Sequence, residues 1–158
     1  DNPTFAGTVL TALLDISAAG AGQIQFPATQ NASAGANTLD DYEEGTWTPV
    51  DSSGAGLTFA VALGRYTKIG QVVLINGNFT YPSTADASAA IVGGHPFASG
   101  NSEQSRGGHK VVSDETTLDA YFLSTNASTA VLRTTSNANV TNATMSTNLA
   151  YVGGNYLV

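Results

Sequence analysis

Two basic side chains in the second half of the chain have the chemistry to hold an anionic sugar. Arg106 and His109 lie within the glycine-containing segment 105–110. A guanidinium group can form two parallel hydrogen bonds to a carboxylate, so Arg106 is a candidate contact for an acidic sugar, with His109 beside it. The same segment is also typical of an ordinary solvated hairpin loop, and the sequence leaves both interpretations open.

Aromatic and amide side chains nearby add the second kind of contact that carbohydrates use. In residues 118–123, strand alternation places Phe122 on the face of Leu118, which predicts that the Tyr121 ring points outward. Sugar C–H faces pack on aromatic rings while sugar hydroxyls bind amides, so Tyr121 and Asn126 are also candidate ligand contacts. Packing at a subunit interface is the competing explanation for an exposed Tyr121.

An acidic block in the first third of the chain has the residue type that a hard cation requires. Ca²⁺ takes several carboxylate oxygens, and the block contains four carboxylates: Asp40, Asp41, Glu43 and Glu44. Its spacing does not match an EF-hand loop. We favour the alternative that these side chains cap turns or pair with Arg65 and Lys68, and we therefore expect no bound metal and no cofactor.

The remaining side chains give little support to catalysis. The chain has no cysteine, which excludes thiol nucleophiles and cysteine metal sites, and it lacks the G-x-S-x-G pattern of a serine hydrolase. A glycosidase needs two carboxyl groups across the sugar. Asp114 and Glu115 are sequence neighbours that would point to opposite faces of a strand, and the pair Glu103 and Asp119 has no further support. We expect that the chain is not an enzyme.

Strand-like patterns occupy most of residues 39–158. Short apolar runs are separated by Gly, Asn and Ser turns, and Val73, Ile75 and Gly77 alternate with residues of the opposite face. Many short strands predict an all-β fold, a β-sandwich of jelly-roll type. The expected strands are 57–63, 64–69, 72–81, 89–92, 110–112, 118–123, 130–135, 143–145 and 149–156.

The first 38 residues have a different character. Apolar residues between Phe5 and Ile16 are spaced as on a helical stripe, which favours a short helix at 8–16, and residues 23–26 resemble one short strand. Linker-like composition follows. We expect residues 1–38 to be an extended or short-helical stem that cannot fold alone.

Composition indicates an acidic protein with a thin core. Twelve acidic and five basic residues give a net charge of −7, which argues against nucleic acid as a partner. Only 35 of 158 residues are Leu, Val, Phe or Ile, little above the level at which disorder is expected, so an oligomer that shares apolar surface is expected. Neither a membrane span nor a signal peptide is visible, and the start at Asp1 suggests a piece of a longer protein.

Three successive blocks resemble a known family. They are AGQIQFPATQ at 21–30, LDDYEEGTWTP at 39–49 and GRYTKIGQVV at 64–73. They resemble the C-terminal regions of bacteriophage tail fibre and tailspike proteins. The residues that carry the resemblance in the second and third blocks are Asp40, Asp41, Tyr42, Glu43, Glu44, Gly45, Trp47, Tyr66, Lys68 and Gly70.

The resemblance implies the distal tip of a phage tail fibre, located in the virion and joined to an upstream fibre shaft. Residues 1–38 would form the stem of a homotrimer, and residues 39–158 a domain that binds a capsule or lipopolysaccharide glycan of the host. Trp47, the only tryptophan, would then be a packing anchor rather than a sugar-stacking platform. The alternative is a structural trimerisation cap of a tailspike whose depolymerase domain lies upstream.

Overall fold

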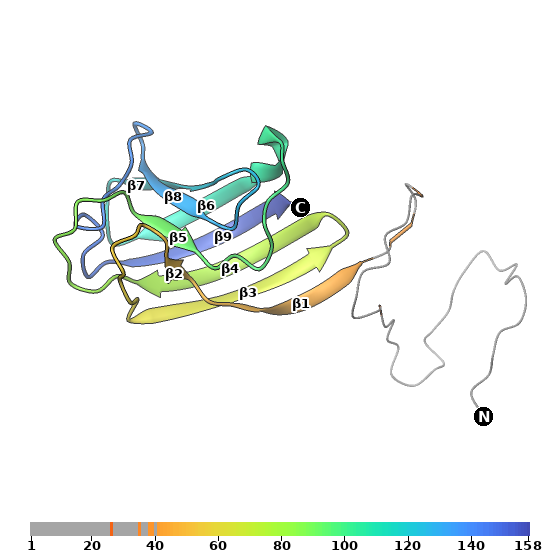
Figure 1. Ribbon diagram of the computed structural model, residues 1–158, viewed down its shortest axis with the longest axis horizontal. Coiled ribbons are helices and arrows are strands. Elements are labelled where there is room, and N and C mark those ends of the chain that lie inside the picture. The colour runs from red at the N-terminus through yellow and green to blue at the C-terminus, as the bar shows by residue number, and fades with distance from the viewer. Residues whose placement is uncertain (1–25, 27–34, 36–37, 40) are drawn as a thin grey trace, which may run out of the picture.

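The computed structural model describes Phe26, Gly35, residues 38–39 and residues 41–158. The helix expected at 8–16, the strand expected at 23–26 apart from Phe26, and Asp40 lie outside the described residues. From β1 onward the chain forms two layers of strands that face each other (Figure 1).

Five strands form the larger sheet. In spatial order they are β1 (Tyr42–Trp47), β3 (Val61–Ile69), β4 (Val72–Thr80), β9 (Leu149–Leu157) and β6 (Gly108–Ser113), and all neighbours are antiparallel. A two-residue turn joins β3 to β4, and Gly70 in this turn has a φ of 56°. A type II′ hairpin turn needs such a positive φ at its first central residue, which glycine adopts without strain. Gly70 therefore has a structural role.

Four strands form the smaller sheet. Their spatial order is β2 (Val50–Asp51), β5 (Ile91–Gly93), β8 (Ala130–Thr134) and β7 (Leu118–Leu123). The 3₁₀ helix η2 (Glu103–Arg106) lies between β5 and β6 in the sequence. No helix in the described part of the chain is long and apolar enough to cross a membrane.

The predicted all-β sandwich is confirmed, but several strand assignments change, and the two-residue strand β2 was not predicted. The runs 57–63 and 64–69 contribute to one strand, β3, which begins only at Val61. Residues 143–145 form a turn rather than a strand. β1 was not predicted, because its acidic residues are typical of a turn, and its pairing with β3 overrides that local preference.

The core lies between the two sheets, and six of the eighteen buried hydrophobic residues in the described part of the chain are aromatic. On β4, Val73, Ile75 and Phe79 are buried while Leu74 is exposed, so the predicted alternation holds. Aromatic side chains bury more area than aliphatic ones, which compensates for the scarcity of large aliphatic residues. The buried aromatic residues are Trp47, Phe59, Phe79, Tyr81, Tyr121 and Tyr156.

Candidate ligand-binding surface

The LDDYEEGTWTP and GRYTKIGQVV blocks pair with each other in the larger sheet. β1 and β3 are antiparallel, with Gly45 opposite Tyr66 and Trp47 opposite Gly64. Each aromatic ring lies against the glycine opposite it, at a position where a Cβ would overlap the ring. The spacing of glycine and aromatic residues in the two blocks therefore has a packing explanation.

Trp47 is a buried packing residue, as predicted, with 5% of its surface exposed. Its Nε1 donates a hydrogen bond to the backbone carbonyl of Asn76 at 3.2 Å, and the indole stacks on the His95 ring with centroids 5.0 Å apart. A ring enclosed in this way is not available to a sugar.

Asp41 in the acidic block forms a buried ion pair with Lys68, as the pairing hypothesis predicted. The Lys68 ammonium group also lies 5.5 Å from the centroid of the Phe97 ring. Removing two charges from water is costly unless they compensate each other, so this pair fixes the start of β1 against β3.

The other described acids of the block have separate partners. Glu43 accepts a hydrogen bond from the Tyr66 hydroxyl, which raises the pKa of Tyr66 to about 12, and Glu44 accepts one from the Tyr42 hydroxyl. Arg65, the other predicted partner, takes no part in the ion pairs of the described residues. Within the described part of the chain, these carboxylates do not converge on a common cation position.

The prediction that Tyr121 is exposed is wrong, because Tyr121 is only 2% exposed. β7 contains a bulge between Leu118 and Ala120, which adds one residue to the strand. One extra residue reverses the alternation beyond it. Tyr121 therefore points into the core, and Phe122, which was assigned to the face of Leu118, points outward.

His109 also lies in a different place from the one predicted. The expected loop is the start of β6, whose alternation directs His109 between the rings of Tyr121 and Tyr156, with centroids 5.7 and 6.2 Å away. Burial, with a smaller contribution from His95, lowers the pKa of His109 to about 4. The imidazole is therefore neutral near pH 7 and is directed away from a surface ligand.

His95 is a buried polar residue that was not predicted from the sequence to have a functional role. Its Nδ1 lies 2.8 Å from the Ser128 carbonyl, which can only accept, so Nδ1 carries the proton. Nε2 then accepts a hydrogen bond from the Tyr121 hydroxyl at 2.8 Å. Burial lowers the pKa of His95, although the Ser128 carbonyl opposes this shift.

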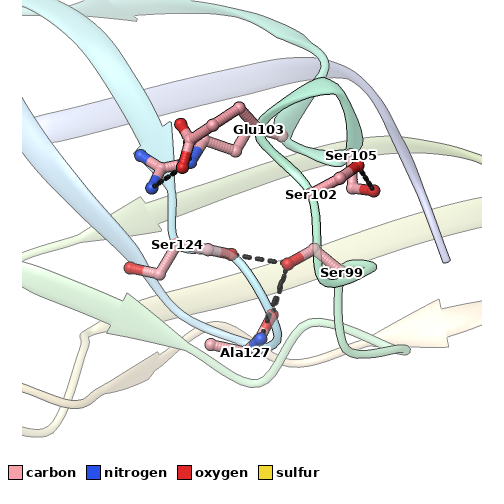
Figure 2. Close-up of polar contacts among 7 residues, drawn as sticks. Ser99, Ser102, Glu103, Ser105, Ser124 and Ala127 are labelled. Atoms are coloured by element: carbon pink, nitrogen blue, oxygen red, sulfur yellow. Dashed lines mark hydrogen bonds and ion pairs between the residues drawn. The ribbon is translucent and has the colours of Figure 1, made fainter.

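Asn126 is exposed in the loop between β7 and β8, with a φ of 51°. Its backbone N–H donates to the Gly100 carbonyl at 3.1 Å. The Ser99 hydroxyl contacts the Ser124 carbonyl at 2.5 Å and the Ala127 carbonyl at 3.4 Å (Figure 2). The Ser99 backbone N–H also donates to the Ala127 carbonyl at 3.0 Å. Two segments far apart in the sequence are thereby held side by side, and Asn126 remains accessible on one of them.

Two arginine side chains meet at the outward ring of Phe122. The guanidinium carbon of Arg106, from η2, lies 4.5 Å from the ring centroid, and that of Arg133, from β8, lies 4.7 Å away. Arg106 contacts the Glu103 carboxylate through Nε at 3.1 Å and Nη2 at 3.2 Å. Arg133 donates to the side-chain oxygen of Asn137 at 3.0 Å. We call Arg106, Phe122 and Arg133 the arginine–phenylalanine cluster.

Comparisons with models of protein families, with curated proteins and with solved structures found no match for this chain. The chemistry of the arginine–phenylalanine cluster therefore has to be inferred from its own contacts.

The Glu103 carboxylate lies against the Arg106 guanidinium group, with one hydrogen bond from Nη2, in the place where the carboxylate of a ligand would bind. The Glu103 side chain is 77% exposed and the Arg106 side chain 23% exposed. Exposed ion pairs contribute little stability, so a ligand carboxylate can displace Glu103 at low cost. The half-buried Phe122 ring lies against both guanidinium groups and holds them beside each other.

Sequence reasoning identified Arg106 but missed its two neighbours in the cluster. Phe122 was assigned to the interior because the alternation was counted without the bulge at Leu118 and Ala120. Arg133 had no signal other than the scarcity of basic residues in the chain.

A second notable surface is the outer face of the larger sheet. Two adjacent shallow hollows of about 610 and 530 Å³ share Thr46, Arg65 and Asn76 as lining residues. The larger hollow is also bordered by Leu63 and Tyr151, both more than half exposed. The lining of the larger hollow is mainly apolar, whereas about half of the lining of the smaller one is polar.

Proposed function

We propose that this chain is the receptor-binding tip of a bacteriophage tail fibre. It binds an acidic glycan on the surface of the host bacterium as a homotrimer, is joined to an upstream fibre shaft, and has no catalytic activity. The resemblance of the LDDYEEGTWTP and GRYTKIGQVV blocks to phage tail proteins supports the phage assignment. The pairing of these blocks as β1 and β3 shows why they would occur together.

The observation that carries ligand binding is the meeting of two guanidinium groups at one outward aromatic ring. The chain has only five basic residues and a net charge of −7, so a cluster with two arginines is the place where an anion is best received. A uronic acid offers a carboxylate that the guanidinium groups of Arg106 and Arg133 can bind. Asn126, exposed on the loop beside the segment that leads to η2, can bind sugar hydroxyls.

The second candidate function is a structural trimerisation cap for a tailspike. The reciprocal packing of Trp47 on Gly64 and of Tyr66 on Gly45 favours this cap function. It gives these residues of the LDDYEEGTWTP and GRYTKIGQVV blocks a role in the fold that requires no ligand. A cap requires no ligand, so binding to glycans separates the two functions.

The test is an array of bacterial capsular and lipopolysaccharide glycans that includes uronic acid polymers and the same polymers after carboxyl reduction. We expect the chain to bind uronic acid polymers, to lose binding when their carboxyl groups are reduced, and to bind more weakly at high salt. Absence of binding to every glycan on the array would support the structural cap. Release of new reducing ends from any polymer would contradict the absence of catalysis.

Two variants with opposite changes of charge assign the binding to the cluster. Arg133→Gln removes one cation from the ring, so we expect weaker binding to the uronic acid polymer. Glu103→Gln releases Arg106 from its carboxylate partner, so we expect binding that is unchanged or tighter. Unchanged binding in both variants would place the glycan elsewhere on the molecule.

A further inference from the structure

The outer face of the larger sheet has an unusual concentration of exposed apolar side chains. Strand alternation directs these side chains away from the core, and they lie on all five strands of the sheet. We call this surface the apolar face. Its large apolar residues are Tyr42, Val61, Leu63, Ile69, Val72, Leu74, Val112 and Tyr151.

The apolar face is large for a surface that stays in water. With roughly 150 to 200 Å² for one fully exposed side chain of this size, these eight residues leave on the order of 600 Å² exposed. A band of polar and charged residues, among them Arg65, Asn76 and Lys110, crosses the middle of the sheet and divides these eight residues into two groups. A stable complex buries about 800 Å² on each partner, polar and apolar atoms together. The apolar face alone supplies most of such an interface.

The distribution of charge favours another copy of this chain as the partner. Like-charged copies with a net charge of −7 repel each other, so they can only meet through a surface that carries little negative charge. Only three charged residues lie at the outward positions of the five strands: Glu44, Arg65 and Lys110. Their sum is +1, so this face adds little like-charge repulsion, and Glu44 of one copy can pair with a basic residue of another.

We propose that copies of this chain pack against one another through the apolar face. The inference rests on the homotrimer of the proposed function and assigns the surface that forms it. Three copies can turn this face toward a common axis, which gives a closed assembly, and apolar side chains of neighbouring copies can fill the hollow between Leu63 and Tyr151. The same burial would enlarge the thin core of each chain.

This arrangement also orients the ligand-binding surface. Phe122 points outward from the smaller sheet, on the opposite side of the sandwich from the apolar face. Packing through the apolar face therefore leaves three arginine–phenylalanine clusters on the outside of the assembly. Three weak sites on one particle can bind a repetitive glycan with high avidity.

Single-cysteine variants test whether the apolar face is covered, because the chain contains no cysteine of its own. Leu63→Cys places a thiol on this face, and Val50→Cys places one on β2 of the other sheet. In a single chain Leu63 is 65% exposed and Val50 45% exposed, so an isolated chain would react with a maleimide at least as fast at position 63. Val112→Cys replaces Leu63→Cys if that variant does not fold, as judged by circular dichroism.

Light scattering on the full chain gives the mass of the sample in which the thiols are labelled. We expect three times the mass of one chain and, because the core of an interface excludes solvent, labelling at least about tenfold slower for Leu63→Cys than for Val50→Cys. Both thiols should react equally fast in urea. A trimer in which both thiols react at similar rates would overturn the apolar face as the interface while leaving the homotrimer intact.

A different result would overturn the inference and the homotrimer together. This result is a monomer at all concentrations in which Leu63→Cys reacts faster than Val50→Cys. If labelling of such a monomer slowed only when phosphatidylcholine vesicles or the uronic acid polymer were added, the occupant of the apolar face would be lipid or glycan rather than a second copy. Glycan binding by the monomer would still support the receptor-binding function.

Discussion

The indole of Trp47 on β1 lies against Gly64, the residue directly opposite it on β3. It also reaches Gly77 on β4, and its Nε1 donates to the Asn76 carbonyl of the same strand. One side chain thereby ties three neighbouring strands of the larger sheet together. The absence of a Cβ at both glycines is what gives the indole its space.

Substitution of Gly64 by alanine should destabilise the fold. The new Cβ would overlap the Trp47 ring, and overpacking of a filled site typically costs about 1 to 3 kcal/mol. Urea denaturation measures the change in the free energy of unfolding. Gly108→Ala is the matched control, because a Cβ there meets open space, and it should leave the stability almost unchanged. Equal effects of the two substitutions would contradict the packing of Trp47 on Gly64.

Substitution of Lys68 by methionine should be strongly destabilising. It leaves the Asp41 carboxylate buried without its cation, and loss of one member of a buried pair typically costs about 3 to 5 kcal/mol. The double variant Asp41→Asn/Lys68→Met has no uncompensated charge and should recover much of the stability. Thermal unfolding of both variants makes the comparison, and a double variant no more stable than Lys68→Met would show that the charge of Asp41 is not the cause.

Stability should fall as the pH is lowered from about 6.5 to about 4, because His109 is neutral in the folded chain and protonated when unfolded. Its folded pKa lies below its unfolded value, so the unfolded state binds more protons in this window and stability rises with pH. The shift corresponds to roughly 3 kcal/mol, reduced to about 2 kcal/mol by partial exposure of the ring. His95, whose pKa is also lowered by burial, adds a loss of the same sign.

Urea denaturation at a series of pH values measures this dependence. His109→Leu removes one titrating group, so its stability should change less between pH 7 and pH 4.5 than that of the original chain. Identical pH dependence in the two proteins would mean that His109 titrates normally in the fold.

Local sequence determined the elements whose signals lie within a few residues. Alternation in β4 indicated which face of that strand is buried, and Gly70 between two apolar runs marked a tight turn. The position of Trp47 within its block indicated a packing anchor, and that prediction is confirmed. The low content of large aliphatic residues indicated a thin core, because few such side chains are available for burial. Composition can be read without knowledge of the fold.

Tertiary structure decided the orientation of residues and the meeting of distant ones. The bulge in β7 reversed the directions of Tyr121 and Phe122, because one unpaired residue reverses the face to which every later side chain of the strand points. The pairing of β7 with β8 determines where this bulge lies. Arg106 and Arg133 come from separate segments and meet only where η2 and β8 lie beside the Phe122 ring. The apolar face likewise exists only because sheet pairing aligns the outward residues of five strands. Alternation within one strand indicates which residues share a face. The pairing between strands determines whether that face is buried or exposed and which residues of other strands lie beside it.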